Sequence, residues 1–99
     1  MELIFEWDEY KARENLKKHK VSFEEAKTVF DDPLLITYPD EFHSEREQRS
    51  IGIGGSASHR ILLVVHTEHE ATIETILIRI ISCRKATALE RRMYEEGED

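Results

Sequence analysis

The sequence predicts an α+β fold, in which three helices pack on a mostly antiparallel sheet of four to five strands. Two observations predict it. Helix-start signals lie towards the two ends of the chain, and later runs of β-branched and apolar residues follow one another with short turns between them. The elements therefore come in the order β-α-α-β-β-β-β-α, which separates most of the strands from the helices, as in other α+β domains.

The first part of the chain is expected to hold one strand and two helices. The run 3–7 predicts a short opening strand, and Asp8 is placed to cap a helix that reaches about Lys18. Ser22 and Glu25 have the spacing of a capping box, in which each side chain bonds the backbone N–H of the other residue. A second helix is therefore predicted to begin after Ser22.

Four strands and a final helix are expected in the rest of the chain. Prolines flank the run 34–38, which makes it an edge or first strand because proline cannot donate to a ladder. The run 61–65 has no polar residue and is typical of a central strand. The other strands are predicted over residues 49–53 and 72–81, with turns at 54–58 and 68–71, and the helix from Lys85 to about Tyr94. The last three strands form an antiparallel meander.

Length and composition limit the class of protein. The 99 residues suffice for one domain, 1–99, with an acidic segment at 95–99 that is expected to fray. No apolar run approaches the roughly 20 residues of a membrane span, and the first residues lack the pattern of a secretory signal. The single cysteine, Cys83, fits a reducing compartment. We therefore expect a soluble, cytoplasmic domain.

The charge is acidic overall but unevenly distributed. A net charge of −7 argues against indiscriminate binding to nucleic acid, because neutralised phosphates supply most of the non-specific affinity. Cations nevertheless cluster at 17–20, 84–85 and 91–92. The sequence therefore predicts a local basic face on an acidic protein.

The junction between the last strand and the last helix is the strongest candidate for an anion site. Arg79 lies within the predicted strand 72–81, and Arg84 and Lys85 follow the end of that strand. Guanidinium groups offer a fixed fork of donors to phosphate oxygens, and the N–H groups of a first helical turn favour negative charge. Two alternatives stay open, namely solvated cations and an ion pair between Arg79 and Glu90.

Residues spread over nearly the whole chain follow one ordered pattern. They are Phe5-Glu6-Trp7-Asp8, Lys11-Ala12, Asn15, Lys18-His19, Val21-Ser22-Phe23-Glu24-Glu25-Ala26, Val29-Phe30, Asp32-Pro33, His43-Ser44, Glu47, Arg49, Ile51-Gly52, Arg60, Val64-Val65, Thr67, Arg79-Ile80-Ile81-Ser82, Arg84-Lys85-Ala86, Glu90 and Tyr94. Together, in this order, they resemble the pattern of the BrnT toxins. The resemblance implies a RelE-like fold, ribonuclease activity within a type II toxin–antitoxin module, and neutralisation by a BrnA-like antitoxin that also binds operator DNA. Two positions depart from the family pattern: Cys83 replaces an alanine, and Lys20 replaces a glycine, which predicts a helix end that avoids the left-handed conformation.

Cleavage of RNA without a metal needs cations for the phosphate, a base for the 2′-hydroxyl and an acid for the leaving oxygen. The residues expected to serve catalysis are Arg79, Arg84, Arg49, Glu90, Tyr94 and Glu47. Those expected to bind RNA are Lys18, His19, Lys85 and His43. His19, His43 and His66 are further candidates for proton transfer. No cofactor or metal is expected, because the acidic loop 40–47 lacks a cysteine pair or a His-x-x-x-His spacing.

A second hypothesis has the chain as a non-catalytic binding module, or a degenerate toxin that acts as a partner in a DNA-binding repressor complex. The net acidity favours this alternative. Under the first hypothesis the expected partners are an RNA substrate and a BrnA-like antitoxin, with operator DNA bound only through the antitoxin. No membrane is expected to take part.

Overall fold

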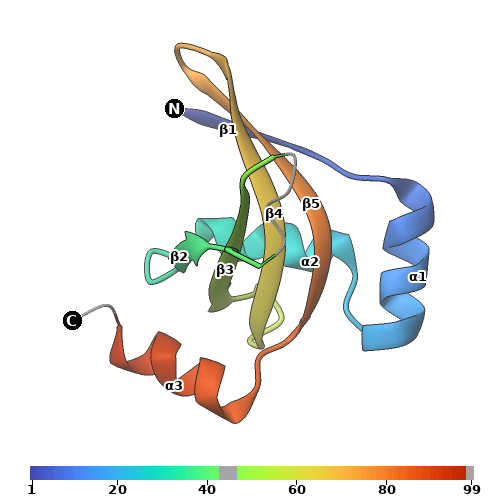
Figure 1. Cartoon of the computed structure of the whole chain (residues 1–99). Helices are drawn as coiled ribbons and strands as arrows, with labels where there is room; N and C mark the ends of the chain where they lie inside the picture. Colours follow the sequence, from blue (N-terminus) through green and yellow to red (C-terminus); the bar gives the residue numbers. More distant parts are fainter. Residues whose placement is uncertain (43–46, 98–99) are drawn as a thin grey trace.

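The computed structural model describes residues 1–42 and 47–97, and its elements follow the predicted order (Figure 1). The fold class predicted from the sequence is confirmed. The strands are β1 (Glu2–Glu6), β2 (Ile36–Pro39), β3 (Arg49–Gly55), β4 (Ile61–Thr72) and β5 (Thr75–Lys85). The helices are α1 (Glu9–His19), α2 (Phe23–Lys27), the short 3₁₀ helix η1 (Thr28–Asp31) and α3 (Ala88–Glu96).

The strands form one mixed sheet in the order β1-β5-β4-β3-β2. The strands β2 to β5 make an antiparallel meander, and β1 pairs in parallel with β5. β2 lies at an edge, as its flanking prolines predicted, and β4 lies in the centre with Leu62 and Val64 fully buried.

The two faces of the sheet are covered unequally. The face behind the strands in Figure 1 packs against α1, α2 and η1, where Phe23, Val29 and Val64 belong to the larger apolar cluster. The opposite face holds a smaller cluster around Ile53 and Leu63, and Tyr94 of α3 packs against it. The rest of that second face has room for a site.

The end of α1 differs from the prediction. Lys20 adopts the left-handed conformation with φ 61°, and its N–H donates to the Leu16 carbonyl over 3.0 Å. The expectation that lysine would avoid this conformation was wrong. The strain, on the order of 1–2 kcal/mol, is offset by this hydrogen bond and by the fully buried Val21 that follows.

The start of α2 matches the prediction only in part. The Ser22 hydroxyl accepts a hydrogen bond from the Glu25 N–H over 3.0 Å, as a cap should. The Glu25 carboxylate does not return the bond, because it binds the Arg60 guanidinium and accepts from the Ser56 hydroxyl. A charged guanidinium is a stronger partner for a carboxylate than a neutral N–H.

The hairpin of β4 and β5 is longer than predicted. β4 continues to Thr72, so the turn lies at 73–74 and not at 68–71. The polar run Glu68 to Glu70 resembled a turn, but these residues lie beyond the last pair with β3, Arg49 with Thr67, and their side chains are exposed. An exposed ribbon tolerates polar side chains that a covered strand does not.

At the C-terminus, α3 includes Glu95 and Glu96, which were expected to fray, while residues 98–99 lie outside the described part. No helix in the described ranges is long and apolar enough to span a membrane.

Candidate functional site

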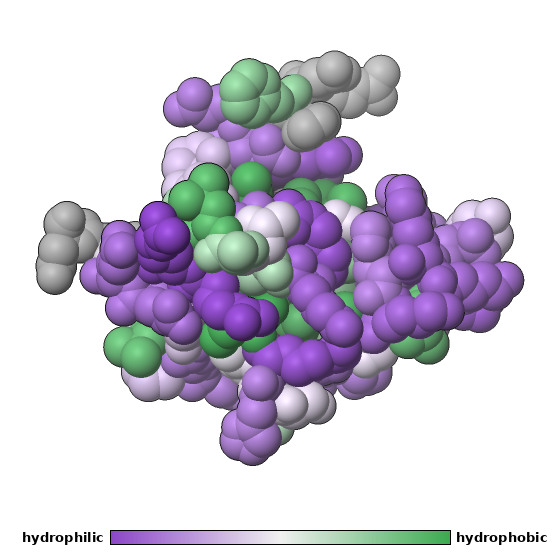
Figure 2. Space-filling model, turned by 90° about the horizontal axis from the view of Figure 1, so that it is seen from below, coloured by the Kyte–Doolittle hydropathy of each residue, from purple (hydrophilic) through white to green (hydrophobic). Residues whose placement is uncertain are grey.

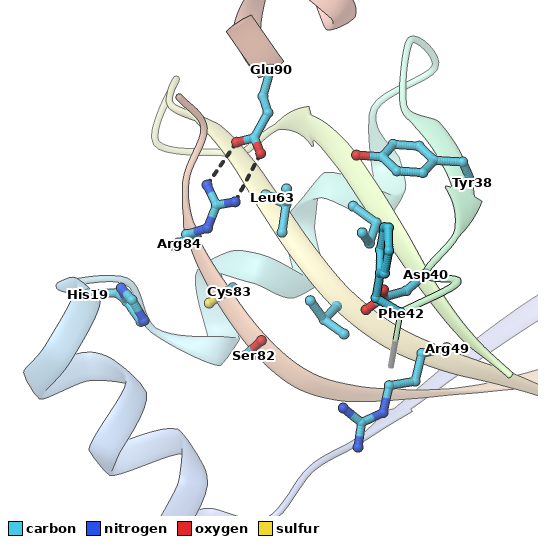
Figure 3. A pocket seen from close by; sticks show the side chains of 12 residues that line it. His19, Tyr38, Asp40, Phe42, Arg49, Leu63, Ser82, Cys83, Arg84 and Glu90 are labelled. Carbon is cyan, nitrogen blue, oxygen red and sulfur yellow. Dashed lines mark hydrogen bonds and ion pairs between the residues drawn. The ribbon is translucent and has the colours of Figure 1, made fainter. Parts of the chain in front are cut away.

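A cavity of about 470 Å³ opens on the less covered face of the sheet (Figure 3). Its floor is apolar and consists of Ile51 from β3 with Leu63 and Val65 from β4. Figure 2, seen from below, shows apolar side chains at the surface between strongly hydrophilic ones. The other residues of the lining are His19, Tyr38, Asp40, Phe42, Arg49, Ser82, Cys83, Arg84 and Glu90.

A β-bulge in β5 decides which arginines share this face. Arg84 lies opposite Leu63 and Arg79 opposite Thr67, and residues directly opposite one another point to the same face. In a regular strand, residues five positions apart would point to opposite faces. Val65 pairs with Ser82, and the next residue, His66, pairs with Ile80, so Ile81 is an extra residue in β5. Because of this extra residue, the side chains of Arg79 and Arg84 point to the same face of the sheet.

Arg84 is held by a carboxylate from α3. Its Nη1 and Nη2 donate to Oε1 and Oε2 of Glu90 over 2.8 and 2.9 Å. The hydrogen bond and charge of Glu90 raise the pKa of Arg84, and Arg84 in turn lowers the pKa of Glu90, so both groups are ionised near neutral pH.

Glu90 also fixes the start of α3. It forms a capping box with Thr87, whose N–H donates to Oε1 over 2.9 Å. The helix therefore begins at Ala88 and not at Lys85, because β5 continues to Lys85 and Thr87 is the cap. At this N–H, the carboxylate of Glu90 takes the place that we expected a bound anion to take.

Arg49, Asp40 and His19 are further charged or ionisable residues of the lining. Arg49 is the first residue of β3 and is half-buried, and Figure 3 shows it at the opposite end of the cavity from Arg84. His19 is the last residue of α1 and stands on the side of Ser82. The cavity thus brings together four of the residues predicted from the sequence: Arg49, Arg84, Glu90 and His19.

Arg79 lies outside this lining. Its Nη1 donates to Glu6 Oε2 over 3.2 Å, so Arg79 does not form the alternative ion pair with Glu90. Arg79 nevertheless lies in one cross-strand row with Thr67 and Arg49, on the face that carries the cavity. The Thr67 hydroxyl in that row is buried and has no hydrogen-bond partner among the described residues.

Tyr94 lines a different cavity and has a structural contact. Its hydroxyl donates to Asp32 Oδ2 over 2.6 Å, and Asp32 also accepts from the N–H groups of Gly55 and Leu34 over 2.7 and 2.9 Å. The bond to the carboxylate, with burial, raises the pKa of Tyr94 to about 12. Asp32 thus ties α3 to the end of the sheet.

The remaining predicted residues are spread over the surface and the core. Glu47 pairs with His69 over 3.4 Å. Lys18 is exposed, and Lys85 lines a separate cavity with Arg60 and Arg91. His66 is fully buried on the opposite face, with its ring 4.9 Å from that of Phe30, measured between centroids. His43 lies outside the described residues.

The sequence indicated neither of the aromatic residues of the lining, Tyr38 and Phe42, and it indicated Asp40 only as part of the acidic loop. Phe42 had the clearest signal, because it is an isolated aromatic residue in a polar loop. Within residues 1–42 and 47–97, no group of three or more His, Cys, Asp or Glu side chains could hold a metal ion.

Comparison with known proteins identifies the family. Residues 7–90 match the family described as "Ribonuclease toxin, BrnT, of type II toxin-antitoxin system". The chain belongs to the BrnT family. As a BrnT toxin it is a ribonuclease with a cognate antitoxin. The fold is similar to that of the Brucella abortus ribonuclease toxin BrnT, with a TM-score of 0.62 and 21% sequence identity over 88% of this chain and 99% of that chain. A comparison with curated proteins found no match.

Proposed function

We propose that this BrnT protein cuts RNA internally, without a metal ion, in the cavity lined by Arg49 and Arg84. One observation carries the proposal. Two guanidinium groups and an imidazole, that of His19, line a single open cavity with an apolar floor. The guanidinium groups can bind phosphate oxygens, and the imidazole can transfer a proton. The apolar floor can contact bases and their sugars.

The proposed reaction is attack by the ribose 2′-oxygen on the neighbouring phosphorus. The 2′-hydroxyl loses its proton to a base, the bond from O2′ to phosphorus forms, and the bond from phosphorus to O5′ breaks. The leaving O5′ takes up a proton. The products are a 2′,3′-cyclic phosphate and a 5′-hydroxyl, so the reaction consumes and releases no other reactant.

Each role has a candidate in the cavity. Arg84 and Arg49 stabilise the charge that grows on the phosphate oxygens. His19 is the candidate for proton transfer, since one nitrogen of an imidazole can accept a proton and the other can donate one. Before RNA binds, Glu90 holds the guanidinium of Arg84 through the bidentate contact. Arg79, on the same face, extends the cationic surface for the RNA backbone.

The partner that we propose is a BrnA-like antitoxin that covers the same cavity and also binds operator DNA. Carboxylates facing Arg49 and Arg84, with apolar side chains over Ile51 and Val65, would complement the lining. RNA and antitoxin then exclude one another, and the proposed compartment is the cytoplasm, where mRNA is translated. Growth arrest on expression of the toxin, relieved by co-expression of the antitoxin but not by an antitoxin that lacks the covering segment, tests this.

A second candidate function is that of a non-catalytic partner in a repressor complex. This alternative is favoured because both terminal nitrogens of Arg84 already donate to Glu90 and so are not available to a phosphate. A protein of this kind would bind its antitoxin and leave RNA intact.

Cleavage of RNA by the purified protein in the presence of a chelator separates the two functions. The wild type should cut RNA, and Arg84→Ala should cut roughly 10²- to 10³-fold more slowly, the usual effect of losing one donor to a developing anion. Arg92→Ala is the matched control, because Arg92 is an exposed cation of α3 outside the cavity lining. Equal activity in wild type and Arg84→Ala, or loss of activity with chelator, would refute the proposal.

A further inference from the structure

We propose that the ring of Phe42 is a stacking platform for a nucleobase of single-stranded RNA, and that Phe42 thereby makes the cavity prefer single-stranded over duplex RNA. The inference rests on the proposed function, because it concerns a base next to the phosphate that Arg49 and Arg84 bind.

Phe42 is unusually exposed for an aromatic residue. The solvent reaches 90% of its surface, whereas the other phenylalanines, Phe5, Phe23 and Phe30, are buried or half-buried. Among the described residues, Phe42 packs against neither apolar cluster of the protein. A ring left in water forgoes the free energy that its burial would contribute, so a ligand that covers the ring gains affinity.

The place of Phe42 selects the kind of ligand. Figure 3 shows the ring standing on the side of the cavity across from His19 and Ser82. The chain just before it is tied to β3, because the Asp40 N–H donates to the Arg49 carbonyl over 2.8 Å. The ring therefore lies two residues beyond a point that is hydrogen-bonded to β3.

Ring and cations together match the two parts of a nucleotide. Arg84 and Arg49 mark the two ends of the same cavity, whose volume is about 470 Å³. When the phosphate of a nucleotide binds Arg49 or Arg84, the base of that nucleotide can reach Phe42, because all three residues line one cavity. Bases that are free to stack on such a side chain belong to single strands, since duplex bases already stack on their neighbours.

Binding of an RNA that cannot be cut tests the inference apart from catalysis. The probe is a labelled single-stranded octamer of 2′-O-methyl RNA, and the measurement is its dissociation constant from fluorescence anisotropy. Phe42→Ala should weaken binding roughly 5- to 150-fold, and Phe42→Trp should preserve it. Ile73→Ala is the matched control, because Ile73 is an equally exposed apolar residue, 94% accessible, in the hairpin turn outside the cavity.

Two further probes separate stacking from a general effect on the protein. With an octamer of the same backbone that lacks all bases, Phe42→Ala and wild type should bind equally. Phe42→Ala and wild type should also bind equally well to the octamer when it is paired in a duplex. Phe42→Leu keeps the apolar bulk without the aromatic face, and it should bind the single-stranded octamer as weakly as Phe42→Ala does.

The outcomes distinguish this inference from the proposed function. If wild type binds the octamer but does not cut unmodified RNA, the proposed function fails while the loss in Phe42→Ala still supports stacking. If Phe42→Ala binds the octamer within twofold of wild type, or loses affinity equally for the probe without bases, stacking is refuted. A Phe42→Ala variant weakened only towards the antitoxin would also refute it.

Discussion

Arg84 and Glu90 face one another across the junction of β5 and α3 as a bidentate ion pair, with N···O distances of 2.8 and 2.9 Å. A phosphate would use the same two nitrogens of the guanidinium. In the form described here the carboxylate therefore occupies the position that a phosphodiester needs, and Glu90 must turn away or share the fork when RNA binds.

The first prediction concerns this competition. Glu90→Gln should bind the uncleavable octamer more tightly than wild type, because the neutral amide no longer competes for Arg84. The slope of log K against log salt concentration should steepen by about 0.7, the contribution of one added phosphate contact on a single strand. Glu96→Gln removes an exposed carboxylate of the same helix and controls for net charge. Unchanged affinity and slope in Glu90→Gln would contradict the competition.

The second prediction concerns the attachment of α3 to the sheet. Tyr94→Phe removes the hydroxyl that donates to Asp32 over 2.6 Å. We expect the free energy of unfolding in urea to fall by about 1.5–3 kcal/mol, the usual range for a hydrogen bond to a charged group. Tyr10→Phe is the control, because Tyr10 is 64% exposed. A loss no larger than that of the control would show that the bond does not hold α3.

The third prediction follows from the proton of Tyr94. Its pKa is raised from 10.0 to about 12, chiefly because the hydroxyl donates to the Asp32 carboxylate. The folded state thus keeps a proton that the unfolded chain loses, so the stabilisation is complete below about pH 10 and is lost as the pH rises towards 12. The free energy of unfolding should fall more steeply over this interval in wild type than in Tyr94→Phe. Parallel pH profiles would be incompatible with the assignment.

The fourth prediction concerns the single cysteine. Burial raises the pKa of the Cys83 thiol to about 12, and the thiol is 1% exposed. Asn15 encloses it, with Nδ2 donating to the Cys83 carbonyl over 3.0 Å and Oδ1 accepting from its N–H over 3.1 Å. A thiol reagent should therefore modify Cys83 in native protein far more slowly than in urea, and faster in Asn15→Ala. Rapid modification of native wild type would refute this account.

Local signals in the sequence predicted most of the fold. The caps Asp8 and Ser22 were predicted correctly, because a cap depends on residues three positions apart. The long hairpin was mispredicted, since the exposure of Glu68 to Glu70 depends on where β3 begins, at Arg49. Burial along a strand is decided by its neighbours, which the sequence of one strand does not contain.

The site was less predictable than the fold for the same reason. Whether Arg79 and Arg84 share a face depends on the inserted residue Ile81, and a shift of one residue moves every following side chain to the other face. The partner of Arg79, Glu6, belongs to a strand from the other end of the chain. Phe42 belongs to the lining because of how the loop after β2 meets β3, which no local pattern specifies.

The most direct test of the central claim, that Arg84 and Arg49 bind the scissile phosphate, is a crystal structure with the uncleavable octamer bound. We expect phosphate oxygens about 3 Å from the guanidinium nitrogens of both arginines, with the contact between Arg84 and Glu90 broken or shared. RNA bound elsewhere, with the Arg84–Glu90 pair intact and the cavity empty, would contradict it.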